Sequence, residues 1–152
     1  MSLNPHYAKS PTDLSVSDQE QLVEMFKTWL SLIAENEPFF DVMSSQYDQY
    51  LGEDLGQFFT PWDVSQLLGA LQVAQERTPN SIHDCCVGGG SLILGQLHAL
   101  YHSQGKEAIQ NLYLELQDID PHMVKLASAQ VVLSSIVHQI PLSHIKVIGG
   151  MS

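Results

Sequence analysis

Strand-like and helix-like segments alternate between residues 61 and 149, and this order constrains the fold more than any other feature. The strand patterns lie at residues 81–86, 112–118 and 145–148, and the helical patterns lie at residues 61–75, 91–104 and 121–136. A strand, a crossover helix and a second strand give a parallel pair with a right-handed connection. We therefore predict an α/β fold on a parallel sheet, whose third strand is an exposed edge or is covered by something outside this chain.

Three parts are expected along the chain. Residues 1–16 mix Pro, Ser, Asn, Lys and Asp without periodicity, which predicts a flexible arm. Residues 17–55 are expected to form an N-terminal helical segment, because apolar side chains recur there at helical spacing. Residues 56–152 hold the alternation of strands and helices. We expect the helical segment to pack with this α/β part as one unit.

Two helix starts carry capping signals. Ser17 and Glu20 match a capping box in front of a helix expected at residues 18–34. Thr60 precedes Pro61 at the start of another, where a threonine can cap the helix and a proline suits its first position.

Charge and hydropathy exclude several roles for the chain on its own. Seventeen Asp and Glu residues stand against six Lys and Arg residues, for a net charge of −11. Nucleic-acid binding draws on basic side chains that neutralise phosphates, so DNA would be contacted only through a missing domain or a partner subunit. No apolar run reaches the ~20 residues of a membrane span, and the N-terminus lacks a signal pattern. We expect a cytoplasmic protein with no membrane partner.

A glycine turn and an aspartate mark the expected ligand site. Gly88, Gly89 and Gly90 follow the first strand and precede a helix, where glycines let a ligand approach the backbone. Asp118 ends the next strand, where a carboxylate can accept hydrogen bonds from both hydroxyls of a ribose. Ligands of such sheets bind beyond the carboxyl ends of the strands. These residues therefore predict a nucleoside site.

The spacing of the glycines argues against a pyrophosphate. Dinucleotide sites use the pattern G-x-G-x-x-G, and Ile93 stands where the third glycine would be. Asp84, at the end of the first strand, would repel phosphates and could meet a ligand ammonium. S-adenosyl-L-methionine (SAM) carries both a ribose and an ammonium, so it fits these residues better.

Three motifs follow one another along the chain: Gly56-Gln57-Phe58-Phe59-Thr60-Pro61, then Asp84-Cys85-Cys86-Val87-Gly88-Gly89-Gly90-Ser91-Leu92, then Asp118-Ile119-Asp120-Pro121. Together they resemble the motifs of the adenine-N6 DNA methyltransferases, especially the modification subunits of type I restriction systems. The resemblance implies a partial Rossmann-like SAM-dependent methyltransferase lobe, preceded by an N-terminal helical segment. The SAM-binding part would span residues 56–152.

The resemblance also implies a contact for each part of the cofactor. The methionine side would be lined by Phe59, Thr60 and Pro61, the amino-acid and sugar region by Asp84, Gly88 and Gly90, the ribose by Asp118, and the adenine ring by Ile119.

The sequence departs from the family pattern at several points. Cys85 stands where a proline is usual, three glycines replace a Gly-Ser-Gly-like turn, and Asp118 replaces a longer glutamate. The catalytic tetrapeptide of the family, Asn or Asp followed by Pro, Pro and an aromatic residue, does not occur in the 152 residues. That tetrapeptide holds the target amine and stacks the flipped base. We therefore expect no catalytic residue here and a chain that is inactive alone.

Other candidates are assigned structural roles. Asn4-Pro5-His6-Tyr7 is similar to the missing tetrapeptide but belongs to the arm, since no strand precedes it. His98 and His102 lie four residues apart on a predicted helix, a spacing that can chelate a metal, but no nearby acid completes an H-E-x-x-H pattern, so no metal is expected. Cys85 and Cys86 lack a C-x-x-C pattern, and packing in the core is expected.

A helix rich in aromatic residues is expected after Pro38. It carries Phe39, Phe40, Tyr47 and Tyr50. Aromatic side chains at helical spacing usually form core, and the acidic surroundings oppose a base-stacking surface.

Two other functions stay open. The chain could be a non-enzymatic methyltransferase-like interaction protein, or part of a small-molecule or protein methyltransferase. The expected edge strand also predicts association, either as a homodimer or with methylase or specificity subunits.

Overall fold

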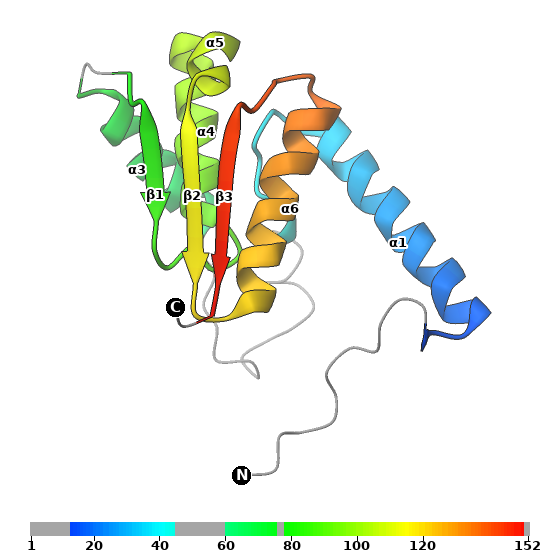
Figure 1. Ribbon diagram of the computed structural model, residues 1–152. Coiled ribbons are helices and arrows are strands. Elements are labelled where there is room, and N and C mark those ends of the chain that lie inside the picture. The colour runs from blue at the N-terminus through cyan, green and yellow to red at the C-terminus, as the bar shows by residue number, and fades with distance from the viewer. Residues whose placement is uncertain (1–12, 45–59, 76–77, 151–152) are drawn as a thin grey trace.

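The computed structural model describes residues 13–44, 60–75 and 78–150. The helices and strands follow the order α1 (Val16–Glu35), α3 (Trp62–Val73), β1 (Ser81–Asp84), α4 (Ser91–Gln104), α5 (Lys106–Gln110), β2 (Tyr113–Asp118), α6 (Pro121–Val137) and β3 (His144–Gly149) (Figure 1). The short helix α5 has no counterpart in the sequence prediction. Residues 42–44 are helical, whereas Phe39 and Phe40, which were expected in a helix after Pro38, precede them without helical structure, and the later residues of that expected helix lie outside the described residues.

The three strands form one parallel sheet in the order β1-β2-β3. Leu114 of β2 pairs with Ile82 of β1 and with Ile145 of β3. β2 is therefore the central strand, and β3 is an edge of the described sheet. These observations confirm an α/β arrangement with a parallel sheet, as the alternation of segments predicts.

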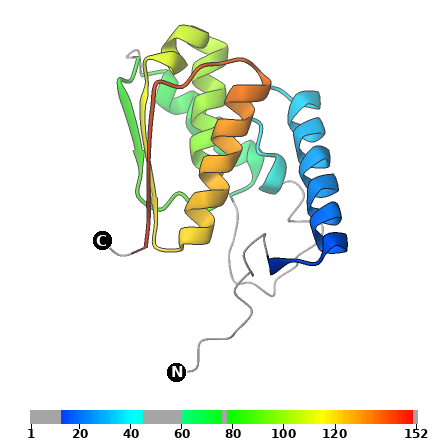
Figure 2. The same cartoon turned by 45° about the vertical axis from the view of Figure 1, so that its right-hand side comes forward.

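Helices α4 and α6 cover one face of the sheet, while the other face carries no described helix (Figure 2). On this open face, His83, Glu115 and Lys146 stand at one level of the three strands. Glu115 lies 3.4 Å from the His83 imidazole and 3.1 Å from Lys146 Nζ. The hydrogen bond to Glu115 also raises the pKa of Lys146. The open face is therefore polar and charge-paired.

The hydrophobic core lies between the sheet and the two covering helices. Leu112, Leu114 and Leu116 are fully buried, as their alternation along the second strand segment predicts. The residues that α4 and α6 contribute to the same cluster are Ile93, Leu94, Leu97, Leu100, Val124, Ala127 and Val131. The core thus fixes both helices against the central strand.

Helix α3 packs closely on α4 through small residues. A Cβ built on Gly95 would lie 2.3 Å from the carbonyl oxygen of Ser65, closer than side chains come, so a glycine is required there. Ser65 lies against Gly95 in the first halves of the two helices, whereas Val73 and Gln104, the last residues of α3 and α4, line one groove between them. The two helices therefore run in the same direction, and the start of α3 lies at the same end of the molecule as the start of α4.

Both predicted caps are wrong in detail. Ser15, rather than Ser17, caps α1, because its Oγ accepts from the backbone N–H of Asp18 at 3.1 Å. Two overlapping Ser-x-x-acid patterns are present, and the helix adopts the earlier one. Helix α3 begins at Trp62, and Pro61 is its N-cap without a side-chain hydrogen bond, so Thr60 does not cap it.

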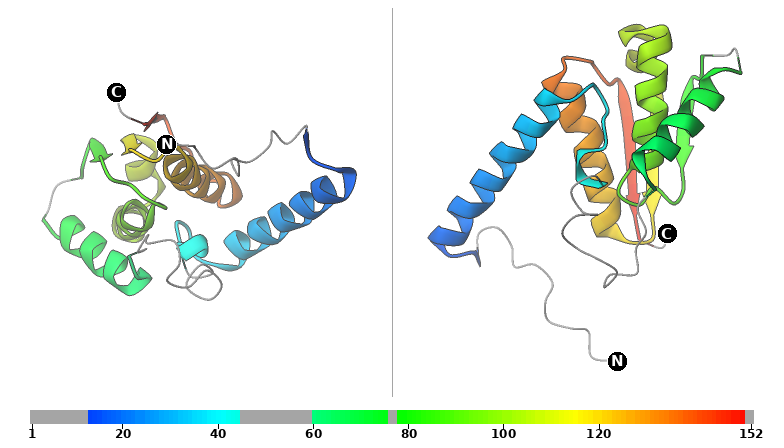
Figure 3. Two further views of the ribbon diagram at one scale, coloured as in Figure 1. Left: turned by 90° about the horizontal axis from the view of Figure 1, so that it is seen from below. Right: turned by 180° about the vertical axis from the view of Figure 1, so that it is seen from behind.

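Helix α1 meets the α/β part at its C-terminal end. Ile33 is buried there, and its carbonyl oxygen accepts a hydrogen bond from His138 Nε2 at 3.1 Å. The first half of α1 extends away from α6 (Figures 1 and 3), and Leu22, Val23 and Phe26 are exposed along it. Even so, none of the described helices combines the length and apolar character needed to cross a membrane.

The aromatic residues after Pro38 contribute to packing where they are described. Phe39 is fully buried in the core, and its N–H donates to Ser134 Oγ at 2.8 Å. Phe40 is half-buried against Trp62, with ring centroids 5.0 Å apart. The two tyrosines of the predicted stripe lie outside the described residues.

Candidate functional site

The candidate site lies at the carboxyl ends of β1 and β2. Asp84 is the last residue of β1, and Asp118 is the last residue of β2. The two strands are parallel neighbours, so their ends meet at one edge of the sheet, at the bottom of Figure 1. The turn at residues 85–90 leads from this edge to the start of α4. The structure thus brings the predicted aspartates and glycines to one place.

Hydrogen bonds tie the glycine turn to the end of β2. The N–H of Gly88 donates to Asp118 Oδ2 at 2.8 Å, and the N–H of Val87 donates to the Gln117 carbonyl at 3.0 Å. The N–H of Asp120 donates to the other carboxylate oxygen of Asp118 at 2.9 Å. A carboxylate offers about four acceptor positions, so two protein donors leave room for ligand hydroxyls. Asp118 is half-buried and reachable.

The two predicted ligand-binding glycines have different surroundings. Gly88 has φ +54°, and a Cβ built on it meets nothing within 4 Å. Gly90 has φ +99°, and its Cβ would lie 3.2 Å from Ala127 of α6. Gly88 therefore leaves open space beside the Asp118 carboxylate, whereas Gly90 lets the turn pass close to α6.

Cys85 and Cys86 are exposed in the turn, and the expectation that they pack in the core is wrong. β1 ends at Asp84, because this carboxylate accepts the N–H of Cys86 at 3.0 Å and turns the chain. The hydrogen bond and charge of Cys85 raise the pKa of Cys86, and the charges of Asp118 and Asp84 raise it further. The carboxylates of Asp84 and Asp118 both accept hydrogen bonds from the turn, and their negative charge suits a ligand ammonium and disfavours phosphates.

A buried polar network, which the sequence does not reveal, supports the turn from behind. Gln130 of α6 donates its amide to the Gly89 carbonyl at 2.9 Å and to Asp41 Oδ1 at 3.0 Å. Ser44 Oγ lies 2.9 Å from Ser91 Oγ. Asp41 and Ser44 come from the segment after Pro38. These contacts join that segment to the start of α4.

The remaining predicted residues fall into three cases. Ile119 directly follows Asp118 and is 71% exposed, so its side chain is available at the strand ends. Thr60 and Pro61 precede α3, whose start lies at the same end of the molecule as the glycine turn. Phe59 lies outside the described residues.

The residues at the strand ends fit the nucleoside and the ammonium of SAM. Asp118 supplies unfilled acceptor positions, Ile119 an exposed apolar surface, and Gly88 space without a side chain. Asp84 and Asp118 place two carboxylates at the ends of neighbouring strands, which suits an ammonium.

Comparison with known proteins agrees with this geometry. The family model described as N-6 DNA Methylase matches residues 38–150, which is most of the chain. The chain belongs to the N-6 DNA methylase family. The matched range takes in β1, the glycine turn and β2, which together form the candidate site.

One curated relative of this N-6 DNA methylase family member is the Type I restriction enzyme MpnII methylase subunit of Mycoplasma pneumoniae. The two sequences are 30% identical over 97 residues, which cover 64% of this chain and 17% of the relative. The match thus spans less than a fifth of that subunit. No solved structure matches the chain.

Proposed function

We propose that the strand-end site binds SAM, and that the chain is the SAM-binding portion of an adenine-N6 DNA methyltransferase of a restriction-modification system. The single observation that carries the proposal is the hydrogen bond from Gly88 to Asp118, which places an acceptor with spare capacity beside an open glycine. The family membership supports the same class of ligand.

Each residue at the site has a proposed role. The Asp118 carboxylate accepts the ribose hydroxyls, and Ile119 packs on the adenine ring. Asp84 faces the ligand ammonium, directly or through water, while Gly88 and Gly90 let the sugar and amino-acid region approach the backbone. Phe59, Thr60 and Pro61 line the methionine side. When bound, SAM supplies the activated methyl group.

The three-stranded sheet is proposed to be part of a Rossmann-like lobe. In a doubly wound sheet helices cover both faces, whereas helices cover one face of the sheet among the described residues. The polar row of His83, Glu115 and Lys146 would then lie toward a further part of the fold. Residues 17–55 are proposed to form a helical segment ahead of this lobe.

DNA methylation is proposed to need more than these 152 residues. The Asn/Asp-Pro-Pro-aromatic tetrapeptide is absent from them, and their net charge is −11. A duplex carries dense negative charge, so basic side chains from another domain or from methylase and specificity subunits would supply the DNA contact. The 152-residue chain alone is expected to transfer no methyl group to adenine.

Calorimetry with nucleosides tests the proposal. S-adenosylhomocysteine, the demethylated form of SAM, is expected to bind the chain, and ADP, which has the same adenosine but carries phosphates, is expected not to bind. Radiolabelled methyl transfer to duplex DNA is expected to be absent. Tighter binding of ADP than of S-adenosylhomocysteine would contradict the proposed ligand class. Methylation of DNA by the chain alone would contradict the proposal that methyl transfer needs more than these 152 residues.

A further inference from the structure

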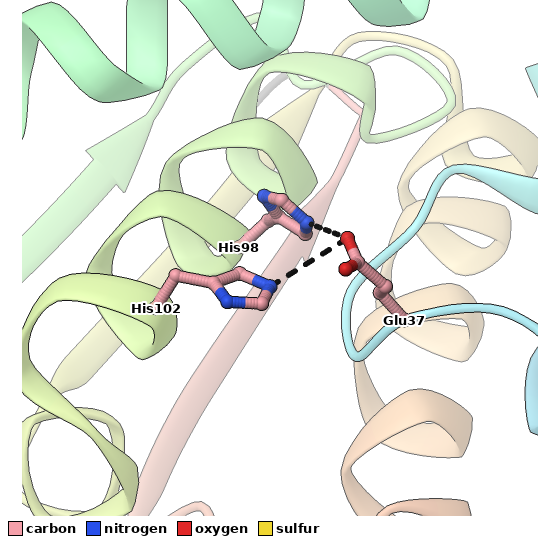
Figure 4. A group of neighbouring side chains, drawn as sticks. All are labelled: Glu37, His98 and His102. Atoms are coloured by element: carbon pink, nitrogen blue, oxygen red, sulfur yellow. Dashed lines mark hydrogen bonds and ion pairs between the residues drawn. The ribbon is translucent and has the colours of Figure 1, made fainter.

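Glu37, His98 and His102 form a compact cluster (Figure 4). Glu37 Oε2 lies 2.7 Å from His98 Nε2 and 3.6 Å from His102 Nε2. No acid completes an H-E-x-x-H pattern around the two histidines in the sequence, but the fold brings Glu37 to them from 61 residues before His98. Tertiary structure, rather than a local motif, completes the cluster.

Helix α4 holds the two imidazoles in place. His98 and His102 are one helical turn apart, so they share a face of α4, and their ring centroids are 4.4 Å apart. The His98 side chain is largely buried and meets Trp62 edge to face, at a centroid distance of 5.3 Å. A ligand site on a packed helix is held more rigidly than one on a loop.

The separations between donor atoms suit a small divalent cation. Zinc binds histidine nitrogen and carboxylate oxygen at about 2.0–2.2 Å in tetrahedral geometry, which places neighbouring donor atoms about 3.3–3.5 Å apart. The two observed nitrogen–oxygen distances, 2.7 and 3.6 Å, lie on either side of that separation.

A groove beside the cluster gives access to it. The groove has a volume of about 700 Å³ and lies between α3 and α4. His98 and His102 both line it, together with Gln66, Ala70, Val73 and Ser103. Two histidines and one carboxylate leave the fourth position of a tetrahedral ion free, as in zinc sites that bind water or another small ligand.

We propose that Glu37, His98 and His102 bind a divalent transition metal ion of the zinc class, with the fourth coordination position open to the α3–α4 groove. The ion would fasten the segment around Glu37 to α4. His98 and His102 lie roughly 10 and 16 Å along α4 from its first residue, so the metal site is separate from the strand-end site.

The test is zinc calorimetry on the full chain carrying Cys85→Ser and Cys86→Ser, because the two exposed thiols would themselves bind zinc. One equivalent of Zn²⁺ is expected to bind. His102→Asn and Glu37→Gln are each expected to weaken binding by about 10- to 100-fold or more, since loss of a direct ligand costs at least as much as loss of a supporting one. His102 and Glu37 are exposed, so these changes are compatible with folding.

His83→Asn is the matched control. His83 also faces a carboxylate, at 3.4 Å from Glu115, but the described residues place no second histidine in contact with that pair. This change is expected to leave zinc affinity unaltered. A second measurement is the visible absorption of bound Co²⁺, which is expected to report nitrogen and oxygen ligands and to disappear in His102→Asn.

Two results would overturn the proposal. The first is an absence of zinc binding at submillimolar metal by a chain shown to be folded by circular dichroism. The second is zinc binding that His102→Asn and Glu37→Gln leave unchanged, which would place the ion elsewhere. In both cases the three residues would form a hydrogen-bonded bridge without a metal.

Discussion

Gly88 donates its backbone N–H to Asp118 Oδ2 at 2.8 Å, across 30 residues of sequence. This bond joins the turn after β1 to the end of β2 and orients the carboxylate. A Cβ built on Gly88 would meet nothing within 4 Å, so the oriented carboxylate lies beside open space. The same interaction thus shapes the turn and leaves Asp118 able to accept further hydrogen bonds.

Gly88 and Gly90 are predicted to differ in their tolerance of alanine. Both have positive φ, so each substitution costs about 1–2 kcal/mol of backbone strain. Gly90→Ala also presses a Cβ against Ala127 at 3.2 Å, so we expect it to destabilise the chain by about 1–2 kcal/mol more than Gly88→Ala. Urea unfolding followed by circular dichroism measures both. Equal losses would show that α6 does not constrain the turn.

Gln130→Leu is predicted to destabilise the chain by about 2–3 kcal/mol, because it leaves the Gly89 carbonyl and the N–H of Met43 without their buried partner. The control is Lys125→Leu on the exposed side of α6, for which we expect a change below about 0.5 kcal/mol. Urea unfolding compares the two. A Gln130 variant as stable as the control would show that the network does not support the turn.

The Cys86 thiol is predicted to react more slowly with iodoacetamide at pH 8 than a cysteine with an ordinary pKa. Cys85, together with Asp118 and Asp84, raises the pKa of Cys86, so less of it is the reactive thiolate at a given pH. Cys85→Ser is expected to speed alkylation of Cys86, since the largest contribution to the shift comes from Cys85. The rate is followed by mass spectrometry from pH 7 to pH 10. If Cys85→Ser does not raise the rate at which Cys86 is alkylated, the assignment of the pKa shift to Cys85 is wrong.

The edge of β3 is predicted to mediate association, as a homodimer or with methylase and specificity subunits. β3 pairs only with β2 among the described strands, and Val147 is 44% exposed beside the open edge. Val147→Lys places a charge there and should reduce association, as edge lysines do. Val16→Lys, at an exposed position on α1, is the matched control. Sedimentation at several concentrations measures the association. A chain that stays monomeric at every concentration would show that the edge of β3 is already protected and would contradict the prediction.

Local patterns predicted the elements well. The alternation of Leu112, Leu114 and Leu116 identified the central strand, because a half-buried or buried strand repeats every two residues. The alternating order of strands and helices predicted a parallel sheet, because a helix between two strands returns the chain to the end where the first strand began. The cap of α1 is Ser15 rather than Ser17, because two Ser-x-x-acid patterns overlap and the pattern alone does not choose between them.

Hydrogen bonds between residues far apart in the sequence could not be predicted from the sequence. Glu37 meets His98 across 61 residues, and Gln130 meets Asp41 across 89. Neither pair lies at a spacing that a periodic element imposes, so only the packing of residues 37–41 against α4 and α6 creates them. The exposure of Cys86 also depended on where β1 ends, which the Asp84 hydrogen bond sets.

The most direct test of the central claim is the binding of S-adenosylhomocysteine to Asp118→Asn, measured by calorimetry beside Glu107→Gln. Both variants remove one negative charge, but Glu107 lies exposed on α5, at the opposite end of the sheet from the candidate site (Figure 1). We predict that Asp118→Asn weakens binding by about 10- to 100-fold, the loss of one or two hydrogen bonds to a charged acceptor, while Glu107→Gln binds like the parent chain. Equal affinity of the two variants, or no binding by the parent chain at millimolar ligand, would contradict the assignment of the strand-end site to SAM.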